Sequence, residues 1–177
     1  RVFAFPCILP PMLNLESLLR IPDIDPGNGY SFSPDGRVAF ACNKSGRWEI
    51  YEFVLKQADK IVQVSRGPGG KFSPRYSPDG KQIVFVSDAA VGDNVWTMKA
   101  DGSDAKALSS ESFRLVNNPV WSPDGLSVAF LRLQPEGGRS DLRLVPPLGG
   151  PERKLAEIRV GEGFVTAPYL AWLPDGS

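Results

Sequence analysis

Histidine is absent from all 177 residues of the sequence. Histidine is the usual general base for a serine or cysteine nucleophile and the commonest side-chain ligand of transition metals. Its absence excludes the Ser-His and Cys-His catalytic pairs and leaves only serine–lysine or carboxylate mechanisms open. We therefore predict no catalytic residue, no metal ligand and no cofactor site in this chain.

Cysteine and long apolar runs are also scarce. The two cysteines, Cys7 and Cys42, lack the spacing of a metal site, and we expect free thiols in a reducing compartment, with a disulfide as the alternative. No apolar run approaches the roughly 20 residues that cross a bilayer. Residues 2–11 are apolar, but prolines interrupt them, and Met12 begins a stretch that is typical of a natural start. We predict a cytoplasmic protein without a membrane span, and a truncated signal peptide at residues 1–11 is the alternative.

An excess of charge of either sign is missing as well. Lysine plus arginine and aspartate plus glutamate both number 20, so the formal net charge is zero. A balanced surface lacks the broad attraction that binds nucleic acid or anionic lipid. We predict neither as a partner.

What the sequence does contain is a repeated turn. Ser-Pro-Asp-Gly occurs three times, a fourth copy begins with leucine, and the aspartates are 44, 45 and 51 residues apart. A period in the forties is typical of a propeller blade with four short strands. In each turn proline fixes φ, aspartate can accept a bond from a nearby backbone N–H, and glycine supplies positive φ. The predicted turn residues are Pro34, Asp35, Gly36, Pro78, Asp79, Gly80, Pro123, Asp124, Gly125, Pro174, Asp175 and Gly176.

The segments around each turn read as strands. An aromatic residue precedes every turn, and a run that is apolar on both faces follows each of the first three, at residues 38–41, 82–86 and 127–131. Such runs suit strands sandwiched between neighbouring blades. A third strand is expected at 48–54, 94–98 and 141–145, and a polar outer strand at 61–64, 105–108 and 153–158.

These patterns predict an all-β fold, a partial β-propeller with three four-stranded antiparallel blades and the first strand of a fourth. We place the blades at about residues 30–70, 71–115 and 116–165, with the next blade beginning at 166–177. Residues 1–29 form an N-terminal extension with a short helix that Asn14 caps and Pro22 ends. Since natural propellers use about four to eight blades, we expect the sequence to be part of a longer chain.

The repeat resembles the WD40-like PD40 repeats of TolB-like proteins. Residues 94–103 (NVWTMKADGS) match the third strand and following turn of that repeat, and the resemblance covers about residues 30–177. A narrower resemblance joins residues 15–22, 29–36, 46–51 and 69–76 to the start of acylaminoacyl- and dipeptidyl-peptidases of the prolyl oligopeptidase (S9) family. In those enzymes a propeller precedes an α/β-hydrolase domain, whose Gly-x-Ser-x-Gly motif and histidine are absent here.

Two functions follow from these resemblances. The S9 resemblance implies a non-catalytic propeller segment that gates or positions peptide substrate for a hydrolase domain that is absent from this chain, and we favour it. The alternative is a TolB-like protein-binding propeller in the periplasm. A third hypothesis, a small stand-alone binding module, would leave apolar blade faces without neighbours.

A few residues outside the turns are candidates for binding chemistry. Arg47 and Arg75 lie beside loops, where each could contact a peptide carboxylate or a neighbouring domain. Asp23 and Asp25 resemble the start of a calcium loop but lack the remaining ligands, so we read them as a turn. The four tryptophans at 48, 96, 121 and 172 are interpreted as blade packing in preference to a stacking site.

Overall fold

The structure is a computed structural model, and it describes residues 24, 29–110, 116–136, 138–159 and 170–173 of the chain. The described residues form three four-stranded antiparallel sheets, and none of them is helical. The helix expected before Pro22 lies outside the described residues, as do Cys7, Asp23 and Asp25. The described residues contain no helix that is long and apolar enough to span a membrane.

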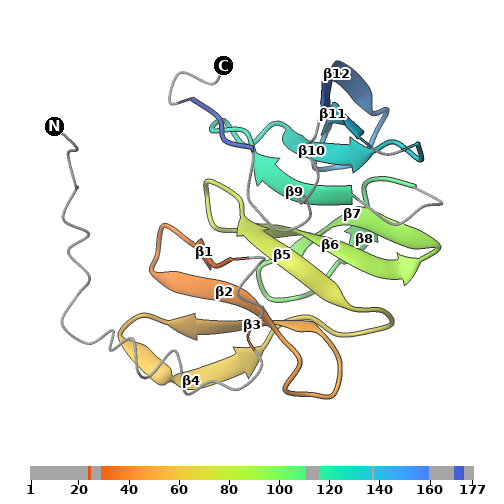
Figure 1. The fold of residues 1–177 in the computed structure, drawn as a ribbon. Helices are drawn as coiled ribbons and strands as arrows, with labels where there is room; N and C mark the ends of the chain where they lie inside the picture. The colour runs from red at the N-terminus through yellow and green to blue at the C-terminus, as the bar shows by residue number, and fades with distance from the viewer. Residues whose placement is uncertain (1–23, 25–28, 111–115, 137, 160–169, 174–177) are drawn as a thin grey trace, which may run out of the picture.

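Each sheet is one consecutive stretch of chain, and Figure 1 shows the three sheets following one another from the first at the bottom to the third at the top. The first sheet comprises β1 (Ser31–Phe32), β2 (Arg37–Cys42), β3 (Glu49–Val54) and β4 (Gln57–Gln63). The second comprises β5 (Lys71–Tyr76), β6 (Gln82–Ala90), β7 (Gly92–Lys99) and β8 (Lys106–Ala107). The third comprises β9 (Val116–Trp121), β10 (Val128–Leu133), β11 (Arg139–Val145) and β12 (Arg153–Arg159). This arrangement confirms the predicted fold class of partial-propeller blades.

The second strand of each sheet is buried on both faces, as its apolar sequence predicted. In β2 the residues from Val38 to Cys42 are all buried, and in β6 so are those from Ile83 to Ser87. Alternate residues of these strands pack on opposite sides. Ile83 and Phe85 join Ala39 and Ile50 in a core cluster shared by the first two sheets, whereas Val84 joins a second cluster shared with the third sheet. The two clusters hold the sheets together as propeller blades.

The outer strands differ most from their expected extents. β4 and β12 are polar and mostly exposed, as predicted for edge strands. β8 is only two residues long, because the chain turns inward after it and Leu108 is buried at 7% exposure against β7. Of the expected fourth blade the structure describes only residues 170–173, as irregular backbone, and the turn Pro174, Asp175 and Gly176 lies outside the described residues.

Candidate binding site at the inner strands

The described Ser-Pro-Asp-Gly turns share one hydrogen-bond pattern. Gly36, Gly80 and Gly125 have φ of 85°, 70° and 73°, a region that glycine occupies without the penalty of a Cβ atom. Each glycine N–H donates to the carbonyl of the serine that opens its turn, at 2.9 to 3.1 Å. The serine Oγ in turn accepts a backbone N–H from just after the turn. The donor is Arg37, directly after the glycine, at 2.8 Å in the first blade, and it is the second residue after the glycine, Gln82 or Ser127, at 2.9 Å in the other two. This pattern closes each turn into a hairpin.

The turn aspartates are engaged within their own turns. Ser77 donates to Asp79 at 2.7 Å and Ser122 donates to Asp124 at 2.5 Å, and the equivalent serine bond reaches Asp35. These bonds lower the pKa of all three carboxyls; for Asp35 the bond from the neighbouring guanidinium is the largest contribution. Because each carboxylate is held by its own hairpin, we propose that these residues are architectural. Among the described residues no three His, Cys, Asp or Glu side chains are grouped so that they could hold a metal ion.

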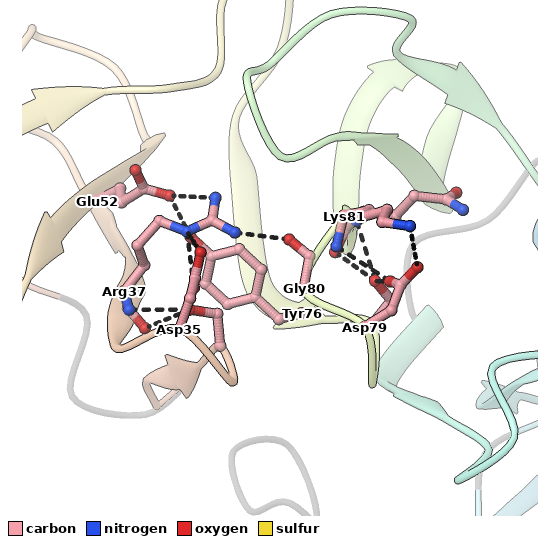
Figure 2. Close-up of polar contacts among 10 residues, drawn as sticks. Asp35, Arg37, Glu52, Tyr76, Asp79, Gly80 and Lys81 are labelled. Carbon is pink, nitrogen blue, oxygen red and sulfur yellow. Dashed lines mark hydrogen bonds and ion pairs between the residues drawn. The ribbon is translucent and has the colours of Figure 1, made fainter.

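One arginine connects the first turn to the second blade. Figure 2 shows Arg37, at the start of β2, reaching across to the second turn, where its Nη2 donates to the Gly80 carbonyl at 2.7 Å. Its guanidinium lies 5.1 Å from the centre of the Tyr76 ring and 3.4 Å from Glu52, and the Tyr76 hydroxyl donates to Glu52. Burial and the bond to Glu52 raise the pKa of Tyr76. This contact between the blades was not predictable from the sequence, because its members are up to 43 residues apart and because arginine and glutamate are usually surface residues.

The first strands of the three sheets lie side by side. Contacts run from β1 to β5 and from β5 to β9. The Tyr76 backbone N–H donates to Ser31 Oγ at 2.8 Å, and the Trp121 indole N–H donates to the Arg75 carbonyl at 2.9 Å. In a propeller the strands that occupy this position line the central channel.

A hollow of about 400 Å³ opens over these inner strands, between the turns. Its walls carry three aromatic side chains from three blades: Phe32, which is 59% exposed, and the more buried Tyr76 and Trp121. Pro34 and Pro78 border it at the turns. Aromatic faces and proline edges from several strands provide apolar surface, and Ser31, Ser33, Ser77 and Arg75 provide polar groups beside it, a combination that is typical of ligand sites.

Arg75 is the cation of this hollow. It lies on β5, is partly buried, and donates from Nη1 to the Pro74 carbonyl at 2.8 Å. Burial lowers the pKa of Arg75, but arginine begins so far above neutrality that the side chain stays charged. A planar, charged donor beside aromatic walls can bind a carboxylate in bidentate fashion.

The other residues singled out from the sequence lie elsewhere. Arg47 is exposed, lies outside the hollow, and donates to the Gly67 carbonyl at 3.3 Å. Trp96 packs at the core cluster between the first two sheets, and Trp48 lies 5.8 Å from the Phe72 ring, centre to centre. Among the arginines and tryptophans singled out from the sequence, Arg75 and Trp121 alone line the hollow as the structure describes it.

Comparison with known proteins agrees with this architecture. Residues 27–177 match the model of the TolB beta propeller domain, PD40. The chain is 38% identical over 124 residues to the uncharacterized peptidase YuxL of Bacillus subtilis, a match that covers 63% of this chain and 18% of YuxL. It is also 38% identical over 93 residues to the Tol-Pal system protein TolB of Anaeromyxobacter dehalogenans, covering 51% of this chain and 20% of that protein. The chain thus spans a fifth or less of each of these two relatives.

Solved structures show the same fold. A TolB-like protein of Agrobacterium tumefaciens superposes with a TM-score of 0.71 at 24% identity, over 83% of this chain and 54% of that one. The acylaminoacyl peptidase structure superposes with a TM-score of 0.54 at 16% identity, over 78% of this chain and 25% of that one. At these identities the likeness concerns the fold alone. It shows that the three sheets are arranged as in known β-propellers.

Proposed function

This chain belongs to the TolB-type β-propeller (PD40) family, and from that premise we propose that it is a non-catalytic propeller segment that binds a polypeptide at the inner-strand hollow. The observation that supports the proposal most is the position of Arg75 among Phe32, Tyr76 and Trp121. Aromatic walls suit the apolar side chains of a peptide, and the guanidinium suits its carboxylate.

The finer form of the proposal is a gate or positioning surface for the peptide substrate of an S9-type serine peptidase. The resemblance to YuxL, a peptidase by name, supports it at 38% identity. In this form the hollow holds one end of a short peptide while a hydrolase domain acts on it. We propose the cytoplasm as its compartment.

A second form is a TolB-like propeller that binds a partner protein. The 38% identity to the Tol-Pal system protein TolB favours it. In this form the partner is a folded protein or one of its extended segments, and the compartment is the periplasm. The two forms share the hollow and differ in what enters it.

Binding of a short peptide tests the shared proposal. The two probes are an N-acetylated tripeptide that ends in a free phenylalanine carboxylate and the same peptide as its C-terminal amide. Calorimetry gives the affinity of each. The acid is expected to bind about tenfold more tightly, the size of one good charge-assisted contact. Arg75→Gln should remove that difference, whereas Arg47→Gln, an exposed arginine outside the hollow, should preserve it. Equal affinity of acid and amide would contradict the proposal.

Extending the same peptide separates the two forms. A gate favours short peptides, so attaching a folded domain to the peptide's N-terminus should abolish binding. A protein-binding propeller should tolerate that domain. The coding sequence of the parent gene gives an independent answer, since the gate requires a Gly-x-Ser-x-Gly hydrolase domain.

A further inference from the structure

A second cavity lies away from the inner strands, between the second sheet and the segment at the end of the first blade. Its volume is about 190 Å³, and its apolar walls are Phe85, Trp96 and Met98. Phe85 and Trp96 stack with ring centres 6.5 Å apart and planes inclined by 26°. An apolar cavity of about 150 Å³ in another protein accommodates benzene, so this cavity is large enough for a single six-membered aromatic ring.

The ammonium group at the cavity wall is already neutralised. Lys71 Nζ donates to the carbonyls of Gly67, Pro68 and Gly69 at 3.0 to 3.1 Å, and it lies 3.2 Å from the Glu49 carboxylate. With four acceptors Lys71 has no donor left for a ligand. The cation that remains at the wall is Arg66, which is exposed.

The indole N–H of Trp96 is an unused donor. Trp96 Nε1 is buried and has no hydrogen-bond partner among the described residues. Native proteins satisfy nearly all buried donors, so a buried indole N–H that lacks an acceptor and belongs to a cavity wall needs an explanation. A ligand that carries an acceptor into the cavity would supply the missing partner.

From these three observations we propose that the cavity between the first two blades binds a small aromatic carboxylate. The ring lies against Phe85, Trp96 and Met98, and the carboxylate accepts the Trp96 N–H and faces Arg66. This site is separate from the inner-strand hollow, with which it shares no lining residue, and it does not depend on the proposed polypeptide binding.

The test uses benzoate and toluene as probes of the 177-residue chain. Labelling tryptophan with ¹⁵N gives one indole signal for each of the four tryptophans, and the signal lost in Trp96→Phe assigns the one of interest. Benzoate is expected to shift the Trp96 indole proton downfield in a saturable way, as a new hydrogen bond does. Toluene, which fits the same ring but lacks the acceptor, should bind without the downfield shift.

Matched variants locate the binding. Ala105 is exposed and lines the cavity, so Ala105→Leu should block it and abolish the shift. Ala156→Leu, at an exposed alanine of β12 in the third blade and outside the cavity, should leave binding unchanged. Arg66→Gln should weaken benzoate about two- to fivefold, as loss of an exposed ion pair does, and should not affect toluene.

Three results would overturn the site. The first is an unchanged chemical shift of the Trp96 indole proton at about 50 mM benzoate, because even a site far weaker than ordinary ligand sites would be occupied at that concentration. The second is an undiminished shift in Ala105→Leu. The third is a downfield shift with toluene equal to that with benzoate, because the indole N–H would then not be bonding to the carboxylate.

Discussion

The buried ion pair between Lys71 and Glu49 gives the sharpest test of how the blades are joined. Their side chains are only 5% and 4% exposed, and their charged atoms are 3.2 Å apart. Glu49 begins β3 in the first blade, and Lys71 begins β5 in the second. Glu49 also accepts the hydroxyl of Ser65 at 2.5 Å. The pair thus fixes the connection between two blades from inside the protein.

Removing one member should cost much more than removing both. Lys71→Met leaves the Glu49 carboxylate buried without its cation, which costs about 3 to 5 kcal/mol in comparable cases. The double variant Glu49→Leu with Lys71→Met leaves neither charge, and replacing a buried pair by apolar groups is often neutral, so we expect a net cost of about 1 kcal/mol. The carbonyls that lose Lys71 belong to Gly67, Pro68 and Gly69, of which the first two residues are exposed and can be hydrated.

Urea unfolding followed by circular dichroism measures these free energies. For a chain of this size about 3 kcal/mol lowers the Tm by roughly 6 to 12 °C. The control is Lys99→Met, which breaks an ion pair with Asp104 whose side chains are 60% and 68% exposed, and which should cost no more than about 1 kcal/mol. If Lys71→Met were as mild as Lys99→Met, or the double variant as unstable as the single one, the reasoning would be refuted.

Three further predictions concern other contacts. Gly102→Ala would place a Cβ 2.1 Å from the Val64 carbonyl oxygen at a φ of +87°, so it should lower the free energy of unfolding in urea by at least about 2 kcal/mol. The control is Gly46→Ala, which has a similar φ of +83° but open space around the Cβ and should cost about 1 kcal/mol. Burial alone would raise the pKa of Asp141, but bonds from Lys154, Gln134 and Arg143 outweigh it and lower that pKa to about 2. The contribution of Asp141 is then complete above its unfolded pKa of about 4 and is lost as the pH falls toward 2, so Asp141→Asn should cost about 1 to 2 kcal/mol at neutral pH and little at pH 2. Arg37→Met removes the bond to the second turn and should lower the free energy of unfolding by about 1 to 2 kcal/mol in urea. Unchanged stability would show that the bond contributes nothing.

The fold was predictable because its signals are local. A proline, an aspartate and a glycine in sequence determine a turn through their own backbone preferences, and the apolar residues from Val38 to Cys42 bury themselves wherever two sheets meet. Strands that follow such turns at a regular period leave few alternatives to a propeller. The turns and strands depend only on neighbours within a few residues, and the period is read directly from the positions of the repeated turn, so a single sequence suffices.

The joints between blades were not predictable for the opposite reason. Lys71 and Glu49 are 22 residues apart, and the two partners of the bond from Arg37 to Gly80 are 43 apart. Charged residues at such separations read as solvent-exposed, because nothing local to either one records that the other will be brought next to it. The same applies to the cavity at Trp96, since its other wall comes from the end of the first blade.

The aromatic residue before each turn shows where a repeat stops predicting function. Phe32, Tyr76 and Trp121 hold the same position in three blades and are 59%, 6% and 8% exposed. Tyr76 and Trp121 each pack on the blade before them and bond to it, through the Tyr76 backbone to Ser31 and through the Trp121 indole to β5. Residues at the same position of the repeat therefore have different roles: Tyr76 and Trp121 mainly join neighbouring blades, whereas Phe32 mainly faces the hollow. A ligand at the hollow should consequently quench the fluorescence of Trp121 only partly, since that ring is mostly buried against the second blade. Phe32→Ala should weaken peptide binding and leave the free energy of unfolding nearly unchanged.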